Sequence, residues 1–140
     1  MQPEDKDSAY LWDMLDAAQT AAQFTPGITI EEYLKDRKIQ LAIERLLEII
    51  GEAANRVSTD FQKNHPEIPW RKIVGQRNVI THEYGEIKQE RIWTVVSTNI
   101  PELIEKLEPL VKSIQQEKEI HTSEGSDIES TKQEDDKDDE

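Results

Sequence analysis

The sequence contains no cysteine. Disulfide bonds and thiolate metal sites are therefore excluded, which fits a protein of the reducing cytoplasm. No apolar run approaches the roughly 20 residues that a membrane-spanning helix needs. The chain begins with polar and acidic residues, unlike the basic and then apolar start of a signal peptide. We expect a soluble, cytoplasmic protein that makes no contact with a membrane.

The residue sets of several familiar chemistries are also missing. None of the histidines, His65, His82 and His121, stands at metal-ligand spacing from another histidine or a carboxylate pair. There is no glycine-rich phosphate loop and no plausible serine or cysteine triad. We therefore expect no metal site and no cofactor, and we expect His65 and His121 to be incidental.

The formal net charge is −13, which argues against a nucleic-acid partner because phosphate binding depends on Lys and Arg. The charge is uneven, however, since residues 115–140 hold eleven acids and three bases. Residues 56–91 reverse the balance, with seven bases against five acids. This local excess is modest and does not by itself predict RNA binding. The seven bases are Arg56, Lys63, Arg71, Lys72, Arg77, Lys88 and Arg91.

Apolar residues recur at helical spacing in the first half of the chain. One helix is predicted from Ser8 to Phe24, and Thr25-Pro26-Gly27 ends it. Thr29 and Glu32 form a capping-box pattern that starts the next segment. That segment carries the clearest apolar stripe, from Ile39 to Val57, and is predicted to be the central core helix.

The second half of the globular part predicts two further helices. A polar stretch, Ser58 to Pro66, is followed by Pro69, which suits the first position of a helix running to about His82. The last helix begins near Lys88, and Pro101 should cause a kink or restart around Asn99. The pattern predicts an all-α protein, an up-and-down bundle of four or five helices within residues 1–114.

Residues 115–140 differ from the rest of the chain. They lack apolar periodicity and are strongly acidic, so they cannot bury enough apolar surface to offset the entropy of ordering. We predict an acidic, disordered tail that keeps the protein solvated. The alternative is that the tail mimics RNA or binds a basic partner.

The most unusual feature of the third helix is the position of Arg77. An ideal helix turns about 100° per residue, which places Arg77 within the apolar stripe that starts at Trp70. A guanidinium there needs a partner, a water-filled cleft or a subunit boundary. Asn78 and His82 share a neighbouring face, and Arg77 and His82 point about 140° apart. Either the helix distorts at its end, or two chains assemble the site.

Two simpler interpretations of these residues are open. A histidine near a helix C-terminus, such as His82, commonly interacts with the helix dipole or lies on the surface. An arginine within an apolar stripe, such as Arg77, commonly extends its head to water or forms half of an ion pair.

The residues from Arg77 to His82, an arginine and a histidine with four residues between them, resemble the motif of HEPN-domain ribonucleases. Three flanking blocks, Glu48–Ala54, Ile68–Gly75 and His82-Glu83-Tyr84, resemble the HepT toxins within that superfamily. The resemblance covers about residues 7–112 and leaves the acidic tail unexplained. A bare motif of this kind is weak evidence, but the ordered blocks make it specific.

The resemblance implies a HEPN-like helical bundle that forms a homodimer, with the two motifs at a cleft along the interface. It implies metal-independent cleavage of RNA, transfer RNA or messenger RNA, through the 2′-hydroxyl. His82 would be the general base or acid, and Arg77 would bind the scissile phosphate. Asn78 would position the imidazole of His82 or the phosphate. Arg71 and Lys72 are the candidates for binding RNA elsewhere on this helix.

The resemblance also implies that the toxin is neutralised by a partner. HepT toxins accept AMP from an MntA-like nucleotidyltransferase antitoxin on a tyrosine two residues after the histidine, and Tyr84 fills that position here. Added AMP would block RNA by charge and by volume. The simpler interpretation of Tyr84 is a core aromatic that closes the third helix.

A different class of function fits the same residues. The chain would then be a non-catalytic helical subunit that presents substrate to a nucleotidyltransferase, with Arg77 and His82 as interface residues. A third alternative is a structural bundle with no partner enzyme.

Overall fold

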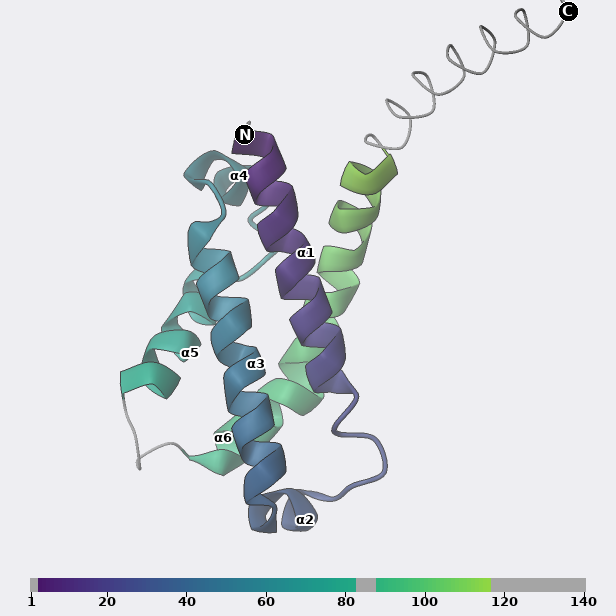
Figure 1. Cartoon of the computed structure of the whole chain (residues 1–140), viewed down its shortest axis with the longest axis vertical. Coiled ribbons are helices and arrows are strands. Elements are labelled where there is room, and N and C mark those ends of the chain that lie inside the picture. The colour runs from purple at the N-terminus through teal and green to yellow at the C-terminus, as the bar shows by residue number, and fades with distance from the viewer. Residues whose placement is uncertain (1–2, 83–87, 117–140) are drawn as a thin grey trace, which may run out of the picture.

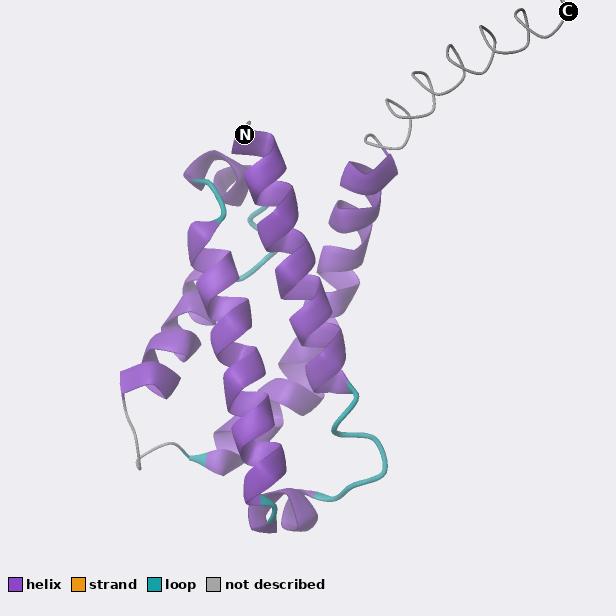
Figure 2. Cartoon of the chain, viewed as in Figure 1, coloured by secondary structure: helices purple, strands orange, loops and turns teal. Residues whose placement is uncertain are grey.

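The computed structural model describes residues 3–82 and 88–116, and every regular element in these ranges is a helix (Figures 1 and 2). The all-α class is therefore confirmed. A last helical stretch, residues 100–116, continues directly from η1. The elements are α1 (Pro3–Ala22), α2 (Ile30–Lys35), α3 (Arg37–Arg56), α4 (Thr59–Asn64), α5 (Trp70–His82), α6 (Gln89–Thr94) and the π-helical turn η1 (Val95–Asn99).

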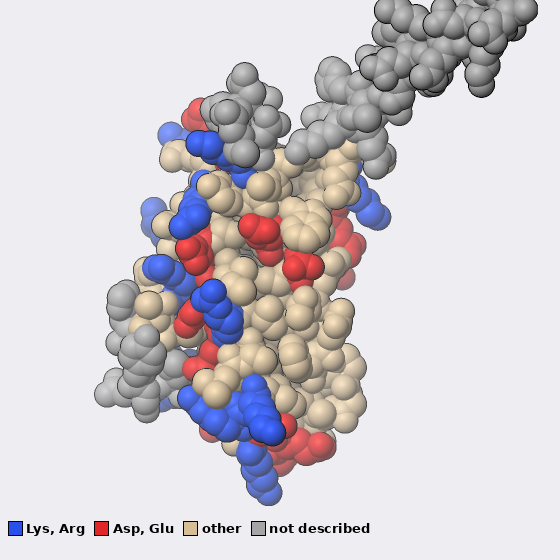
Figure 3. All heavy atoms as spheres, in the orientation of Figure 1, with Lys and Arg blue, Asp and Glu red and all other residues tan. Residues whose placement is uncertain are grey.

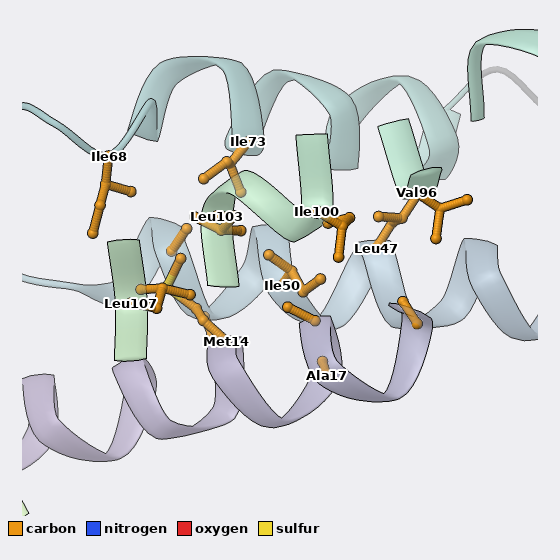
Figure 4. Close-up of a cluster of buried hydrophobic side chains, with 14 of the residues drawn as sticks. Met14, Ala17, Leu47, Ile50, Ile68, Ile73, Val96, Ile100, Leu103 and Leu107 are labelled. Carbon is orange, nitrogen blue, oxygen red and sulfur yellow. The ribbon is translucent and has the colours of Figure 1, made fainter. Parts of the chain in front are cut away.

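The long helix α3 lies at the centre of the bundle, with its most extensive contacts to α1 and α5. Its apolar residues recur every three or four positions, which turns one continuous stripe toward the core. Figure 4 shows side chains of α1, α3, α5 and residues 100–116 meeting in that core. Those labelled include Met14, Ile50, Ile73 and Leu103, all at most 7% exposed. The packing of α5 on α3 fixes the orientation of the candidate site.

The capping box at the start of α2 is confirmed. The Thr29 hydroxyl accepts a hydrogen bond from the Glu32 amide at 3.2 Å, and the Glu32 carboxylate accepts one from the Thr29 amide at 3.4 Å. The expectation that one helix runs on from there is wrong. Asp36 adopts an extended conformation and its carboxylate caps α3 by accepting from the Ile39 amide at 3.1 Å, so α2 and α3 are separate helices.

The polar stretch after α3 contains a helix that its composition did not reveal. The short α4 is capped by Ser58, whose hydroxyl accepts from the Phe61 amide at 3.2 Å. The Ser58 amide and hydroxyl both donate to the buried carboxylate of Asp7, at 2.8 and 2.6 Å. These bonds connect the first turns of α1 to α4. Pro69 lies one residue before α5, not inside it, and its carbonyl accepts from the Ile73 amide at 3.1 Å.

The irregularity expected before Pro101 takes the form of η1. The Ile100 amide donates to the Val95 carbonyl, five residues back. Proline has no amide hydrogen and its ring collides with the carbonyl four residues earlier, so a wider turn before Pro101 accommodates it. The predicted tail and its boundary near residue 114 stay predictions, because residues 117–140 lie outside the described part. None of the described helices is long and apolar enough to cross a membrane.

Candidate functional site

Arg77 of α5 packs directly against Gly51 of α3. Gly51 of α3 faces it, and a Cβ atom added to Gly51 would overlap the Arg77 Cβ and lie 2.8 Å from its Cγ. The Ile73 carbonyl oxygen would be 3.2 Å away. The aliphatic stem of Arg77 therefore packs against bare backbone of α3, as its place in the apolar stripe predicted.

The head of Arg77 reaches the surface. Its Nη1 atom donates to the Oδ1 atom of Asn78 at 3.1 Å. Arg77 is half-buried and Asn78 is exposed. Among the described residues no carboxylate pairs with Arg77. The guanidinium is thus held by a neutral neighbour and keeps its charge available.

The third member of the predicted catalytic group cannot be placed beside these two. The helix α5 extends through His82, but the side chain of His82 and the whole of Tyr84 lie outside the described residues. The backbone from Arg77 to His82 is helical, so their directions differ by about 140° on one helix. The structure therefore brings Arg77 and Asn78 together and leaves the other two assignments as predictions.

Three basic side chains surround a hollow of about 630 Å³ at the start of α5. Lys63 comes from α4, and Arg71 and Lys72 come from α5. Every other residue that lines the hollow is uncharged, and within the described part of the chain none of the three bases forms an ion pair. Figure 3 shows Lys and Arg side chains along the edge of the molecule where α4 and α5 lie.

Lys63 was not among the predicted RNA-binding residues, although it belongs to the locally basic segment 56–91. Only the local excess of bases pointed to Lys63, because the sequence pattern did not predict α4. The wall of the hollow is kept in place by Trp70, whose indole nitrogen donates to the His65 carbonyl at 2.9 Å. His65 stacks on Phe61 at a centroid distance of 4.2 Å, so its role here is structural.

A second hollow, of about 770 Å³ and mainly apolar, lies between α5 and α6. Gly75 and Val79 contribute to it from α5, and Ile92 and Val95 from the following segment. Val79 is 44% exposed, and a Cβ atom added to Gly75 would meet nothing within 4 Å. By helical angle, Gly75 and Val79 point within about 60° of the direction of His82. The described monomer thus leaves an apolar surface open on the His82 side of α5.

Tyr33 and Glu67, which lie outside the site, have pKa values shifted by burial and by hydrogen bonding. Burial, with a smaller effect of Glu44, raises the pKa of the Tyr33 phenol above its ordinary value, and Arg37 acts in the opposite direction. The phenol donates to the Gln89 side chain at 2.6 Å, joining α2 to α6. A hydrogen bond to its own backbone amide lowers the pKa of the exposed Glu67. The described residues hold no group of three His, Asp or Glu side chains placed to bind a metal ion.

Comparison with known proteins decides the family. The family described as "Ribonuclease HepT-like" matches residues 14–110, more than two thirds of the chain. This chain belongs to the HepT-like ribonuclease family. The match contains Gly51, Arg77 and the whole of α5, so the resemblance inferred from the motif is confirmed at the level of the family.

Individual relatives agree with this assignment. A Thermococcus cleftensis protein named "Probable ribonuclease HepT" is 41% identical over 103 residues, which is 74% of this chain and 94% of the relative. A Methanocaldococcus jannaschii protein named "Putative RNase MJ0127" is 37% identical over 111 residues, 79% of this chain and 92% of the relative. No solved structure gives a significant match.

The HepT-like match ends before the acidic tail. Residues 111–140 lie outside it, while the relatives are covered over more than nine tenths of their own lengths. Most of the helical bundle therefore lies within the family match, and the acidic residues 117–140 lie outside it.

Proposed function

We propose that this chain is a metal-independent endoribonuclease toxin whose site consists of Arg77, Asn78 and His82 at a homodimer interface. The 2′-hydroxyl of the RNA attacks the adjacent phosphorus, the bond from phosphorus to the 5′-oxygen breaks, and a 2′,3′-cyclic phosphate forms. His82 takes the proton from the 2′-hydroxyl or supplies one to the leaving oxygen. Arg77 binds the phosphate and stabilises the charge that develops on it.

The observation that supports this proposal most directly is the setting of Arg77. Its stem is fixed on Gly51 and its head is free of any described carboxylate. A guanidinium that is held in place and not neutralised can bind a phosphate in two-pronged fashion without first breaking an ion pair. Asn78 accepts a hydrogen bond from the Arg77 guanidinium at 3.1 Å and so orients it toward the phosphate.

The proposed dimer would explain how Arg77 and His82 can act on one phosphate although they point in different directions. On one helix Arg77 and His82 diverge by about 140°, so a phosphate meets both only if another copy supplies one of them. The open apolar surface at Gly75 and Val79 is suited to packing between copies. Arg71 lies on the same side of α5 as Gly75. Arg71 and Lys72 would then guide RNA toward the interface.

We propose further that Tyr84 is the point of control. A cognate MntA-like nucleotidyltransferase would transfer AMP from ATP to the phenol oxygen and release pyrophosphate. The added phosphate is negative and the adenosine is bulky, so both repel or exclude RNA near His82. The position of the tyrosine two residues after the histidine supports this assignment.

The catalytic proposal is tested by RNA cleavage in the presence of EDTA. The wild type should cut RNA, and His82→Ala and Arg77→Met should cut it at a much lower rate. Arg77→Met keeps a stem on Gly51 while it removes the charge, so lost activity would not reflect lost packing. Equal cleavage by all three proteins would refute the assignment, and no cleavage by any would favour the non-catalytic subunit.

The AMP proposal has a separate test. Intact mass after co-expression with the nucleotidyltransferase should increase by one AMP unit, and Tyr84→Phe should abolish the increase. Modification that persists in the phenylalanine variant would place the acceptor elsewhere.

A further inference from the structure

The acidic charge of this chain is concentrated where the family match does not reach. Residues 117–140 hold eleven acids against three bases, out of a formal net charge of −13 for the whole chain. The last seven residues contain six acids, Glu134, Asp135, Asp136, Asp138, Asp139 and Glu140. A polyanion of this density presents to a protein surface much of what a nucleic-acid backbone presents.

The described part of the bundle carries a complementary surface beside α4 and α5. The hollow at the start of α5 carries Lys63, Arg71 and Lys72, with no acid in its lining and no ion pair to these bases in the described residues. Unpaired cations gathered around a concave surface favour an anionic occupant.

The starting point of the tail suits this occupant. The helix of residues 100–116 ends at the same end of the bundle as α4, which forms one wall of the hollow (Figure 1). An extended chain spans up to about 3.3–3.6 Å per residue, so the remaining 24 residues could reach about 80 Å. Covalent attachment also gives the tail an effective concentration of the order of millimolar near the surface.

We propose that the acidic tail, residues 117–140, binds in the hollow lined by Lys63, Arg71 and Lys72 and competes there with RNA. The binding of the tail stands on charge and placement alone. Its inhibitory consequence rests on the proposed function, because it assumes that these bases guide RNA to Arg77. The family match ends at residue 110, so this control would be an addition of this chain to the site that lies within the match.

The binding step is tested without RNA by zero-length carboxyl-to-amine cross-linking of the full chain. Peptides that join the tail to Lys63 should be found by mass spectrometry. Arg71→Gln removes a charge from the hollow and introduces neither an amine nor a carboxyl that could react with Lys63, so the yield at Lys63 should fall at least about fivefold if charge holds the tail there. Circular dichroism would verify that the exposed substitution leaves the bundle folded.

Proximity alone makes a different prediction. If the tail is only near α4 and is not bound there, the Lys63 yield stays the same in Arg71→Gln, and the proposal is refuted. Lys35→Gln with Lys38→Gln, at two exposed bases of α2 and the start of α3, is the control and should not change the yield at Lys63.

The competition step is tested with a fully 2′-O-methylated RNA, which binds but cannot be cut. Asp135, Asp136, Asp138 and Asp139 changed together to Asn should raise affinity about tenfold, the factor expected if the tail occupies the hollow about nine tenths of the time. The matched control removes four exposed charges elsewhere, by Asp13→Asn, Asp16→Asn, Glu102→Gln and Glu105→Gln. An equal gain in that control would show general repulsion and overturn the proposal.

The two proposals fail in different ways. Absence of RNA cleavage by the wild type would remove the ribonuclease assignment while cross-links at Lys63 still reported tail binding. Cleavage without those cross-links would leave the ribonuclease proposal intact and refute the binding of the tail in the hollow.

Discussion

Gly51 of α3 and Arg77 of α5 pack directly on each other, because the arginine stem occupies the space that a side chain on Gly51 would need. Glycine weakens a helix interior by roughly 0.5–1 kcal/mol relative to alanine, so its presence in the middle of α3 has a packing reason. Without it α5 would stand further from the core, and Arg77 would lose the support that fixes its direction.

Gly51→Ala should therefore destabilise the protein. The added methyl collides with the Cβ of Arg77 and with backbone, which cannot swing away as a side-chain end could. Overpacking of this kind costs about 1–3 kcal/mol, partly offset by roughly 1 kcal/mol of helix propensity. Urea unfolding measures the difference. Gly75→Ala, where a Cβ meets nothing within 4 Å, is the control and should be neutral or stabilising; equal losses would show that the close contact is not the cause.

Substitutions at Arg77 itself should separate packing from chemistry. Arg77→Met and Arg77→Ala both remove the guanidinium, and each should lower the cleavage rate by about 10²–10³-fold, the usual effect of removing one transition-state contact. Only Arg77→Ala should also lower the free energy of unfolding, because it removes the Cγ beside Gly51 and the rest of the aliphatic stem. Steady-state cleavage beside thermal melting gives both quantities. A full rate in the methionine variant would contradict a role for the charge.

Helical periodicity placed Arg77 correctly in the apolar stripe but gave no sign of what lay beneath it. Gly51 has no side chain, so it contributes nothing to an apolar pattern. For a related reason α4 was missed: its sequence is polar, and its start depends on the Ser58 cap and on Asp7, 51 residues away. Asp36 divides α2 from α3 through a local cap within an otherwise continuous stripe. The roles of His82 and Tyr84 stay predictions, because helical periodicity gives only the direction of a side chain and not the groups that it meets.

The half-buried cap residue Ser58 should contribute strongly to the free energy of unfolding. Ser58→Ala removes the acceptor for the Phe61 amide and the hydroxyl donor to Asp7, leaving a buried carboxylate with fewer partners. Loss of a cap and of a bond to a charged group together should reduce stability by about 1–3 kcal/mol. Thr59→Ala, next to it and exposed, is the control for chemical denaturation. Indistinguishable variants would mean that the bonds to Asp7 contribute little.

Alkaline pH should weaken the fold through Tyr33. Its pKa is raised in the folded state by burial, whereas in the unfolded chain a tyrosine titrates near about 10. The unfolded state therefore loses its proton first, and the stability that the neutral phenol contributes declines as pH increases above about 10. Urea midpoints measured from pH 8 to pH 11 should fall less steeply in Tyr33→Phe than in the wild type. Tyr10→Phe, which leaves Tyr33 in place, should keep the wild-type slope.

The products of cleavage should identify the nucleophile. If the 2′-hydroxyl attacks, the upstream fragment carries a 2′,3′-cyclic phosphate and the downstream fragment a 5′-hydroxyl, and both masses are distinguishable from hydrolysis products. A single 2′-deoxy nucleotide at the cut position should abolish cleavage there while binding persists, because the phosphate contacts of Arg77 do not require the hydroxyl. The same substitution one position downstream is the control and should leave the cut unchanged. A 3′-hydroxyl and a 5′-phosphate at the cut would instead mean that an activated water attacks, and His82 would then need a different role.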